Sequence, residues 1–323
     1  MHRDSRVKAL AATISLVGLL AALAAGGPAS AAPGAHASAC TPSKNTEAII
    51  DDSGSMSGSD PTKLRTKFLD VFANIGANNG KTLGAVEFGS TANLLFAPAT
   101  IPGVIPAMNA SFALVDADNG GTDYDEGFAA ANSSNPAATS RIFLTDGQAA
   151  TPTQHLTPTI KTYVIGLGLS SSSAQQLLSD IASQTGGPPP FLLDDASQLQ
   201  PVAGAITALQ NCKRVLTFTR TFTNRGQTFG FSFKAKGKSA DILQTWPNLG
   251  SILDIVKVFQ PRARKAGASA SAVAHTAVKI RKKKGDTFTT VRLKGLKKGR
   301  KVKFKVRAKA LVGATVGTTQ VIR

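Results

Sequence analysis

The residues that could do chemistry begin with Asp51-Asp52-Ser53-Gly54-Ser55, which directly follows the apolar run Ala48-Ile49-Ile50. This stretch places one carboxylate and two hydroxyls at alternate positions, at the end of an expected buried strand. Such oxygens are the ligands of hard divalent cations, and Mg²⁺ needs near-octahedral oxygen geometry while it keeps several waters. Three side chains do not complete a site, so we expect further oxygen donors from other loops.

Two later segments offer such donors. Gly120-Gly121-Thr122-Asp123 is a glycine-rich loop ahead of a helix and carries a hydroxyl, and Arg141 to Gly147 is an apolar strand that stops at Asp146. Taken singly, each segment is also typical of a plain turn or a helix cap. Their joint occurrence indicates one cation site divided over three loops.

The elements that must position these loops alternate between strands and helices. Short apolar or β-branched runs predict strands over 46–50, 82–88, 92–97, 139–144 and 159–167, and helical spacing predicts helices over 63–78, 124–132, 172–184 and 198–211. This order predicts an α/β fold, a doubly wound, mostly parallel, Rossmann-like sheet with helices on both faces. Ligands of such folds lie outside the carboxyl ends of the strands, where Asp51 and Asp146 are expected.

Asp51-x-Ser53-x-Ser55, then Gly121-Thr122, then Leu144-Thr145-Asp146-Gly147 resemble the von Willebrand factor type A (VWA) domain and its metal-ion-dependent adhesion site. The resemblance covers roughly residues 40–212, and it implies bound Mg²⁺, with Mn²⁺ or Ca²⁺ as alternatives. It implies that the hydroxyls of Ser53, Ser55 and Thr122 contact the metal and that Asp51 and Asp146 act nearby, often through water. The remaining coordination position would receive an acidic side chain of a protein partner. A structural metal site without an external partner stays open.

Residues 1–39 do not belong to this fold. Arg3, Arg6 and Lys8 precede an apolar run, and small residues follow it, which is typical of a secretory signal peptide with a short leader. A membrane anchor and a lipid anchor at Cys40 are the alternatives. No later segment has the length and apolarity of a transmembrane helix. We expect a soluble, secreted protein. Association with the cell surface is a further option.

The chain has two cysteines, Cys40 and Cys212. In an oxidising compartment two thiols are expected to pair, and such a disulfide would tie together the two ends of one domain. Two unpaired thiols are the alternative.

The formal charge of +18 over 323 residues averages two unlike parts. Residues 39–212 hold seven basic and fifteen acidic side chains, whereas residues 213–323 hold 27 basic and three acidic ones. The composition therefore predicts a domain boundary at Cys212, with residues 40–212 as the VWA-like domain and 213–323 as a basic domain. From Val215 onward apolar residues alternate as in half-buried antiparallel strands, which predicts a smaller all-β sandwich. The part from Leu293 to Ala308 resembles the end of a fibronectin type III domain, with Val302 where that family has its corner tyrosine.

Basic side chains are dense in this second domain. They alternate with apolar residues from Lys301 to Lys309, so one face of that strand should be buried and the other a row of positive charge. A solvated, solubilising face and a polyanion-binding face are both open. The candidate polyanion-binding residues are Arg281, Lys282, Lys283, Lys284, Lys297, Lys298, Arg300, Lys301, Lys303 and Lys305. Few large rings and no familiar motif accompany them, which disfavours specific nucleic-acid binding.

Two functions follow from these patterns. The first is a secreted binding or adhesion protein, whose VWA-like domain binds Mg²⁺ and captures an acidic residue of a protein partner. The second is an envelope-associated polyanion-binding protein that acts through its basic domain, with a structural metal site. An enzyme is disfavoured because His155 and His275 are isolated and no catalytic constellation accompanies them.

Overall fold

A computed structural model describes residues 40–147, 149, 154–261, 275–276 and 278–323. Residues 41–323 form one compact unit. The expected signal peptide and leader, residues 1–39, lie outside the described residues. None of the helices in the described part of the chain is both long enough and apolar enough to cross a membrane.

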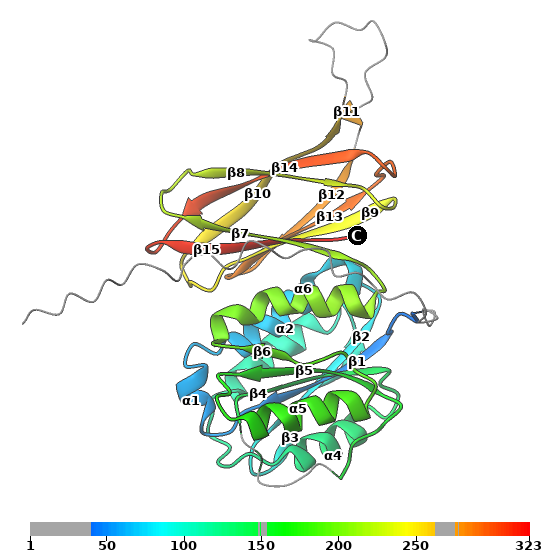
Figure 1. Cartoon of the computed structure of the whole chain (residues 1–323), viewed down its shortest axis with the longest axis vertical. Coiled ribbons are helices and arrows are strands. Elements are labelled where there is room, and N and C mark those ends of the chain that lie inside the picture. The colour runs from blue at the N-terminus through cyan, green and yellow to red at the C-terminus, as the bar shows by residue number, and fades with distance from the viewer. Residues whose placement is uncertain (1–39, 148, 150–153, 262–274, 277) are drawn as a thin grey trace, which may run out of the picture. The chain divides into compact units, whose positions relative to one another are not determined.

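The first half of this unit contains a six-stranded sheet in the order β3-β2-β1-β4-β5-β6 (Figure 1). All neighbouring pairs are parallel except β2 with the edge strand β3. The strands are β1 Asn45–Asp51, β2 Thr82–Phe88, β3 Ala92–Thr100, β4 Ser140–Thr145, β5 Lys161–Leu167 and β6 Phe191–Leu193. Because β1 and β4 are parallel neighbours, their carboxyl ends meet at one edge of the sheet.

Helices cover both faces of this sheet, with α2 and α6 on one face and α4 and α5 on the other (Figure 1). The helices are α1 Met56–Ser59, α2 Leu64–Asn74, α3 Ile105–Ser111, α4 Tyr124–Ser134, α5 Ser172–Gln184 and α6 Leu199–Gln210, with short 3₁₀ turns η1 Gly76–Asn78, η2 Phe112–Leu114 and η3 Ala196–Gln198. Successive side chains of β1 point to opposite faces of the sheet, because a β-strand is pleated. Ala48 and Ile50 belong to the buried cluster of α2 and α6, whereas Ile49 belongs to that of α4 and α5.

The predicted fold class is confirmed: an α/β part with a mostly parallel sheet precedes an all-β part. The predicted elements of the α/β part match observed strands and helices to within a few residues. The long helix expected over 63–78 ends at Asn74, because Gly76 opens the 3₁₀ turn η1.

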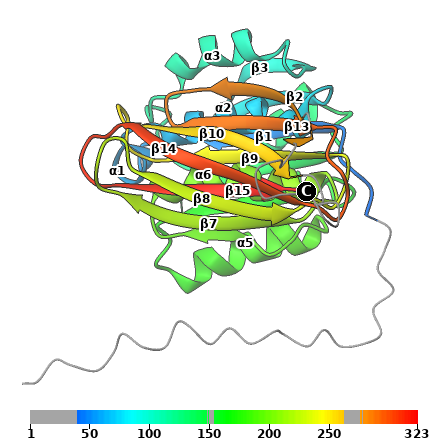
Figure 2. The same cartoon turned by 90° about the horizontal axis from the view of Figure 1, so that it is seen from above.

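The second half is a β-sandwich of two antiparallel sheets, in the orders β11-β10-β14-β8 and β12-β13-β9-β15-β7 (Figure 2). Its strands are β7 Val215–Phe222, β8 Thr228–Lys234, β9 Ser239–Thr245, β10 Ile252–Pro261, β11 His275–Thr276, β12 Lys279–Lys284, β13 Phe288–Lys294, β14 Lys301–Ala310 and β15 Thr315–Ile322. Inward side chains of both sheets, including Phe231, Ile242 and Phe304, form one buried cluster. The strands on either side of residues 262–274 therefore belong to one sandwich rather than to two separate pieces.

Strand β9 is buried on both faces. Ile242 packs in the core of the sandwich, while its neighbour Leu243 belongs to the same buried cluster as α2 and α6. Phe288 and Ile322 join that cluster, and the hydroxyl of Thr290 donates to the carbonyl oxygen of Asn74 at 3.1 Å. The architecture thus changes from α/β to all-β at Cys212. The α/β part and the sandwich nevertheless pack against each other through buried apolar side chains.

The two cysteines form a disulfide. Both Cys40 and Cys212 are disulfide-bonded, and the chain contains no other cysteine that either could pair with. The predicted pairing is confirmed.

Candidate metal centre

Asp51 occupies the carboxyl end of β1, and its side chain is completely buried. Its carboxylate accepts a hydrogen bond from the backbone N–H of Ser53 at 2.8 Å and another from the hydroxyl of Thr145, the last residue of β4. These bonds fix the Asp51 carboxylate between the ends of two neighbouring strands.

The loop after β1 brings the hydroxyl of Ser55 to Asp146, with the hydroxyl of Ser53 beside it. Ser53 Oγ lies 3.1 Å from Ser55 Oγ, and Ser55 Oγ donates to Asp146 Oδ1 at 2.8 Å. Ser55 stands at the N-cap of α1, yet its side chain makes no capping hydrogen bond. Its hydroxyl therefore faces the acid of the third loop instead of serving as a helix cap. Ser53 is buried, whereas Ser55 is exposed, so the site reaches the surface at Ser55.

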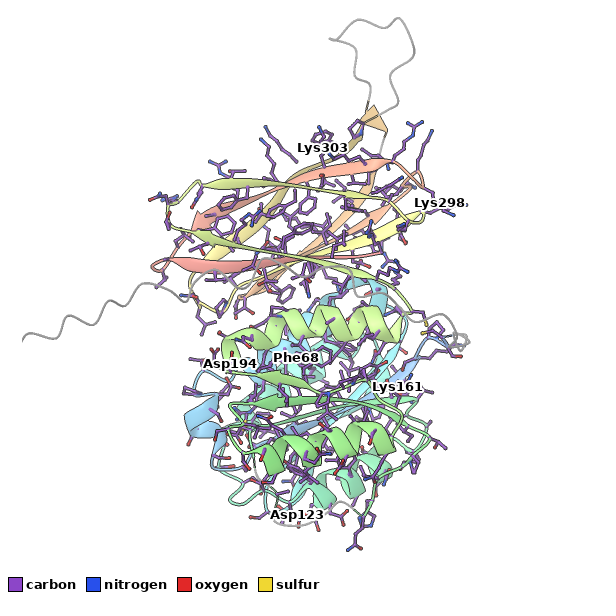
Figure 3. The ribbon with its side chains drawn as sticks, viewed as in Figure 1. Phe68, Asp123, Lys161, Asp194, Lys298 and Lys303 are labelled. Atoms are coloured by element: carbon purple, nitrogen blue, oxygen red, sulfur yellow. The ribbon has the colours of Figure 1, made fainter. Side chains whose placement is uncertain are left out.

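The glycine-rich loop ahead of α4 closes on the same place. The backbone N–H of Gly54 donates to the carbonyl oxygen of Gly120 at 2.8 Å. Thr122 lies against Gly147, because a Cβ built on Gly147 would be 2.8 Å from Thr122 Cγ2 and 3.2 Å from its Oγ1. The capping role at α4 is taken by Asp123 (labelled in Figure 3), whose carboxylate accepts from the N–H groups of Asp125 and Glu126. The Thr122 hydroxyl is thus not needed as the helix cap.

The charges of this cluster point to a cation. Burial raises the pKa of Asp51 to about 6, hydrogen bonds from Ser53 and Thr145 partly offset this, and the carboxylate of Asp146 raises it further. Among the described residues, no lysine, arginine or histidine forms an ion pair with Asp51 or Asp146. Two carboxylates and adjacent hydroxyls without a basic partner are a donor set that fits a hard divalent cation.

Asp52 has a different role from its neighbour Asp51. Its carboxylate is buried against Arg65, with Oδ1 2.8 Å from Arg65 Nη2, and it accepts from the backbone N–H groups of Asp116 and Ala117. Arg65 also pairs with buried Asp60 at 3.2 Å. Asp52 therefore holds α2 and the 116–117 loop against the end of β1 and does not face Asp146.

A second group of acids, not singled out from the sequence, consists of Asp52, Asp116 and Asp118, with one carboxylate oxygen of each within 4.8 Å of the others. The Asp52 oxygens in this group already accept from Arg65 and from two backbone N–H groups. We assign no ligand role to this group.

Three residues that support the predicted set were missed from the sequence. Thr145 binds Asp51 and also accepts from the backbone N–H of Gly147 at 2.9 Å. The hydroxyl of Ser59, at the end of α1, donates to Asp146 Oδ2. The hydroxyl of buried Tyr124 donates to the carbonyl oxygen of Gly147 at 2.8 Å. Only Thr145 carried a sequence signal, since it precedes Asp146 in the third motif.

The structure divides the candidate polyanion-binding residues among three places. Lys301, Lys303 and Lys305 are exposed on β14, and Lys297, Lys298 and Arg300 lie in the loop before it. The remaining four, Arg281 to Lys284, form most of β12. Figure 3 labels Lys298 and Lys303, which represent the loop and the strand.

Fold and site together define the class of domain. A mostly parallel sheet between two helical layers, with candidate oxygen donors gathered at the carboxyl ends of β1 and β4, is the arrangement that the resemblance to a VWA domain predicts. The predicted resemblance to the VWA domain is confirmed at the level of the fold. Solved structures of VWA proteins are among those similar to this chain. No protein-family model and no curated protein matches the chain.

Three solved structures illustrate the similarity. A von Willebrand factor type A protein from Catenulispora acidiphila is 18% identical, over 85% of this chain and 64% of that one, with a TM-score of 0.45. Proximal thread matrix protein 1 from the mussel byssus, with a zinc-occupied MIDAS motif, is 16% identical over 55% of this chain, with a TM-score of 0.43. The PilB minor pilin of Streptococcus sanguinis is 14% identical over 53% of this chain and 62% of that one, with a TM-score of 0.42. The match spans half the length of the mussel protein chain.

Proposed function

We propose that this chain is an exported binding or adhesion protein that holds Mg²⁺ at the carboxyl edge of β1 and β4 and captures an acidic side chain of a protein partner. The observation that carries the proposal is the convergence of Asp51, Ser55 and Asp146 without a basic partner among the described residues. Mn²⁺ and Ca²⁺ have the same preference for oxygen and are alternative occupants.

The ligands would be the hydroxyls of Ser53, Ser55 and Thr122, with Asp51 and Asp146 acting nearby through water. A divalent cation held mainly by neutral hydroxyls retains net positive charge and attracts a further carboxylate. Ser55 is exposed, so a carboxylate from outside can approach the site on that side. The role that we propose is therefore binding and not catalysis. Export is proposed from the features of residues 1–39, and the disulfide fits an oxidising compartment.

The first experiment measures metal binding by the full chain. Titration with MnCl₂, followed by the electron paramagnetic resonance signal of free Mn²⁺, should show one saturable site that Mg²⁺ competes for. Asp51→Asn and Ser53→Ala should abolish or strongly weaken it. A wild-type chain that leaves all Mn²⁺ free would contradict the proposal.

The second experiment separates partner capture from a structural metal. Water bound to Mn²⁺ enhances the relaxation of solvent protons, so the loaded protein should show this enhancement. Acetate, which mimics a glutamate side chain, should lower it by displacing water, whereas acetamide should have little effect. If the protein binds Mn²⁺ but acetate changes nothing, the metal is structural and the capture role is wrong.

A further inference from the structure

The outer face of the four-stranded sheet carries a straight row of cations. In β14, Val302, Phe304 and Val306 are buried, whereas the intervening basic side chains are exposed. β14 pairs with β10 on one side and β8 on the other, so the row runs along an interior strand and not along an edge. Figure 3 labels Lys303, a member of this row. We call the four residues Lys301, Lys303, Lys305 and Arg307 the β14 row.

The spacing of this row is set by the strand. Alternate residues of an antiparallel strand are about 6.8 Å apart, so the four charges span about 20 Å. The residues of β8 paired with the last three members are small: Ser232 faces Lys303, Gly230 faces Lys305, and Thr228 faces Arg307. These small neighbours leave the row uncovered along the β8 side.

The acids of residues 213–323 are already engaged elsewhere. Asp241 pairs with Arg292, and Asp286 lies 2.9 Å from Lys67. Asp254 is the third, and its buried carboxylate binds Lys282, Lys284 and Lys309. In the described part of the chain no ion pair joins any member of the β14 row to an acid. Asp254 is the cross-strand neighbour of Arg307, but its ion pairs are with Lys282, Lys284 and Lys309. The four side chains of the row therefore have no acid at ion-pair distance among the described residues, whereas Lys309 at the end of the row has one.

We propose that the β14 row binds a linear polyol-phosphate polymer, a chain of phosphodiesters joined by short polyols, laid along the strand. A three-carbon polyol separates successive phosphates by roughly the distance between alternate residues of a strand, about 7 Å. One phosphate can thus meet each cation without bending the polymer or the sheet. Lys301, Lys303 and Lys305 belong to the predicted polyanion-binding set, and Arg307 is added to it. Of the predicted residues in β12, Lys282 and Lys284 bind Asp254, and Lys283 donates to Asn74 Oδ1 at 3.2 Å.

Nucleic acids fit this face less well. The phosphates of one DNA strand follow a helical path around the duplex axis, with a rise of about 3.4 Å per nucleotide, so a straight row of cations cannot follow several of them in succession. Unpaired bases need a series of rings on which to stack. The rings of β8 and β14 pack on the opposite face, in the core of the sandwich, where Phe231, Phe233 and Phe304 are buried and Phe229 is partly buried. Phe259 of β10, paired with Lys303, is a single half-buried ring on the neighbouring strand.

The test measures binding of the full chain to fluorescently labelled poly(glycerol phosphate) at a series of NaCl concentrations, in EDTA so that the metal centre does not contribute. Four contacts predict that log K falls with log[NaCl] with a slope of about −3. The double variant Lys303→Gln/Lys305→Gln should weaken binding about tenfold or more at low salt and flatten the slope by 1 to 2.

The matched control is Lys236→Gln/Lys238→Gln, which removes the same charge from exposed positions between β8 and β9. It should leave affinity within about threefold and the slope nearly unchanged. An equal loss of affinity for the polymer in both double variants would indicate a diffuse effect of net charge. It would overturn the assignment of the binding site to the β14 row. Tighter binding of duplex DNA of equal charge, or no binding of the polymer at low salt, would overturn the proposed ligand class.

Discussion

The hydroxyl of Thr145 donates a hydrogen bond to the buried carboxylate of Asp51, and this bond joins the carboxyl ends of β1 and β4. These strands are parallel neighbours, with Ile50 paired to Leu144 just before the bond. The first and third segments of the candidate metal centre are therefore held together by a buried side-chain contact as well as by the sheet.

Replacing Thr145 by valine tests this contact. Valine keeps the shape but removes the hydroxyl, so Asp51 loses one hydrogen bond, worth about 1 kcal/mol, and gains freedom to turn away. We expect the affinity for Mn²⁺ to fall by roughly fivefold. Thr145→Ser, which keeps the hydroxyl, should bind nearly as the wild type does. Calorimetric titration decides, and equal affinity in all three proteins would show that the bond does not position the carboxylate.

The closeness of Thr122 and Gly147 leads to a second prediction. A methyl group on Gly147 would meet Thr122 Cγ2 at 2.8 Å, so Gly147→Ala should push Thr122 away from the centre and weaken Mn²⁺ binding several-fold. Gly58→Ala is the matched control, because nothing lies within 4 Å of the Cβ it would add. Both variants should remain folded by circular dichroism. Unchanged Mn²⁺ affinity in Gly147→Ala would remove Thr122 from the proposed ligands.

The main elements of the α/β part could be predicted because each has a strong local pattern. The helix over Ser172–Gln184 shows helical spacing and a serine cap, and its bounds agree with the prediction. Alternation of apolar and polar residues does not identify strand β9, for a physical reason. Because Ile242 and Leu243 are buried on opposite faces, the strand lacks the alternation that identifies a half-buried strand.

The candidate site was predictable in its segments but not in its contacts. The order of the three motifs identified Asp51, Thr122 and Asp146, since backbone topology places strand ends together. The hydrogen bonds of Thr145 and Ser59 depend on the direction of single hydroxyls in the folded chain. Nothing in the local sequence determines such directions. The same limit applies to Asp254, whose three lysine partners come from two strands.

A third prediction concerns pH and Glu47 of β1. Its side chain is completely buried, with hydrogen bonds from Ser134 and Asn135 to its carboxylate oxygens. Burial raises the pKa of Glu47 from 4.5 to about 7, which those hydrogen bonds only partly offset. Between these values the folded chain keeps a proton that the unfolded chain has lost. The free energy of unfolding should therefore decrease as pH rises from about 4.5 to about 7.

Glu47→Gln should remove this contribution. Between about pH 4.5 and pH 7, the free energy of unfolding of the wild type should fall by up to about 3 kcal/mol relative to that of the variant. The variant should then be the more stable protein at pH 8. Urea unfolding at several pH values, in EDTA and at constant ionic strength, measures the difference. Because Asp51 contributes in the same direction in both proteins, the comparison isolates Glu47. Parallel curves would show that Glu47 does not titrate in this range.

The adjacent acids Asp51 and Asp52 give the fourth prediction, because the structure assigns them opposite roles. Asp51→Asn should abolish tight Mn²⁺ binding and leave the free energy of unfolding in EDTA at pH 7 unchanged or higher, since its buried charge has a raised pKa and no basic partner among the described residues. Asp52→Asn should keep Mn²⁺ binding and lower the free energy of unfolding. It removes one of the two carboxylates that pair with buried Arg65, so we expect a loss of about 3 kcal/mol in stability.

Mn²⁺ affinity of the Asp52→Asn protein should stay within a few-fold of wild type wherever that protein is folded, because Asp52 does not face Asp146. Titrations at 10 °C favour the folded state of this variant, and a folding check by near-ultraviolet circular dichroism accompanies each one. The informative comparison is between the two asparagine variants. Their substitutions lie at adjacent positions and change the charge by the same amount. If Asp52→Asn lost the metal while Asp51→Asn kept it, the ligand set proposed at the end of β1 would be wrong.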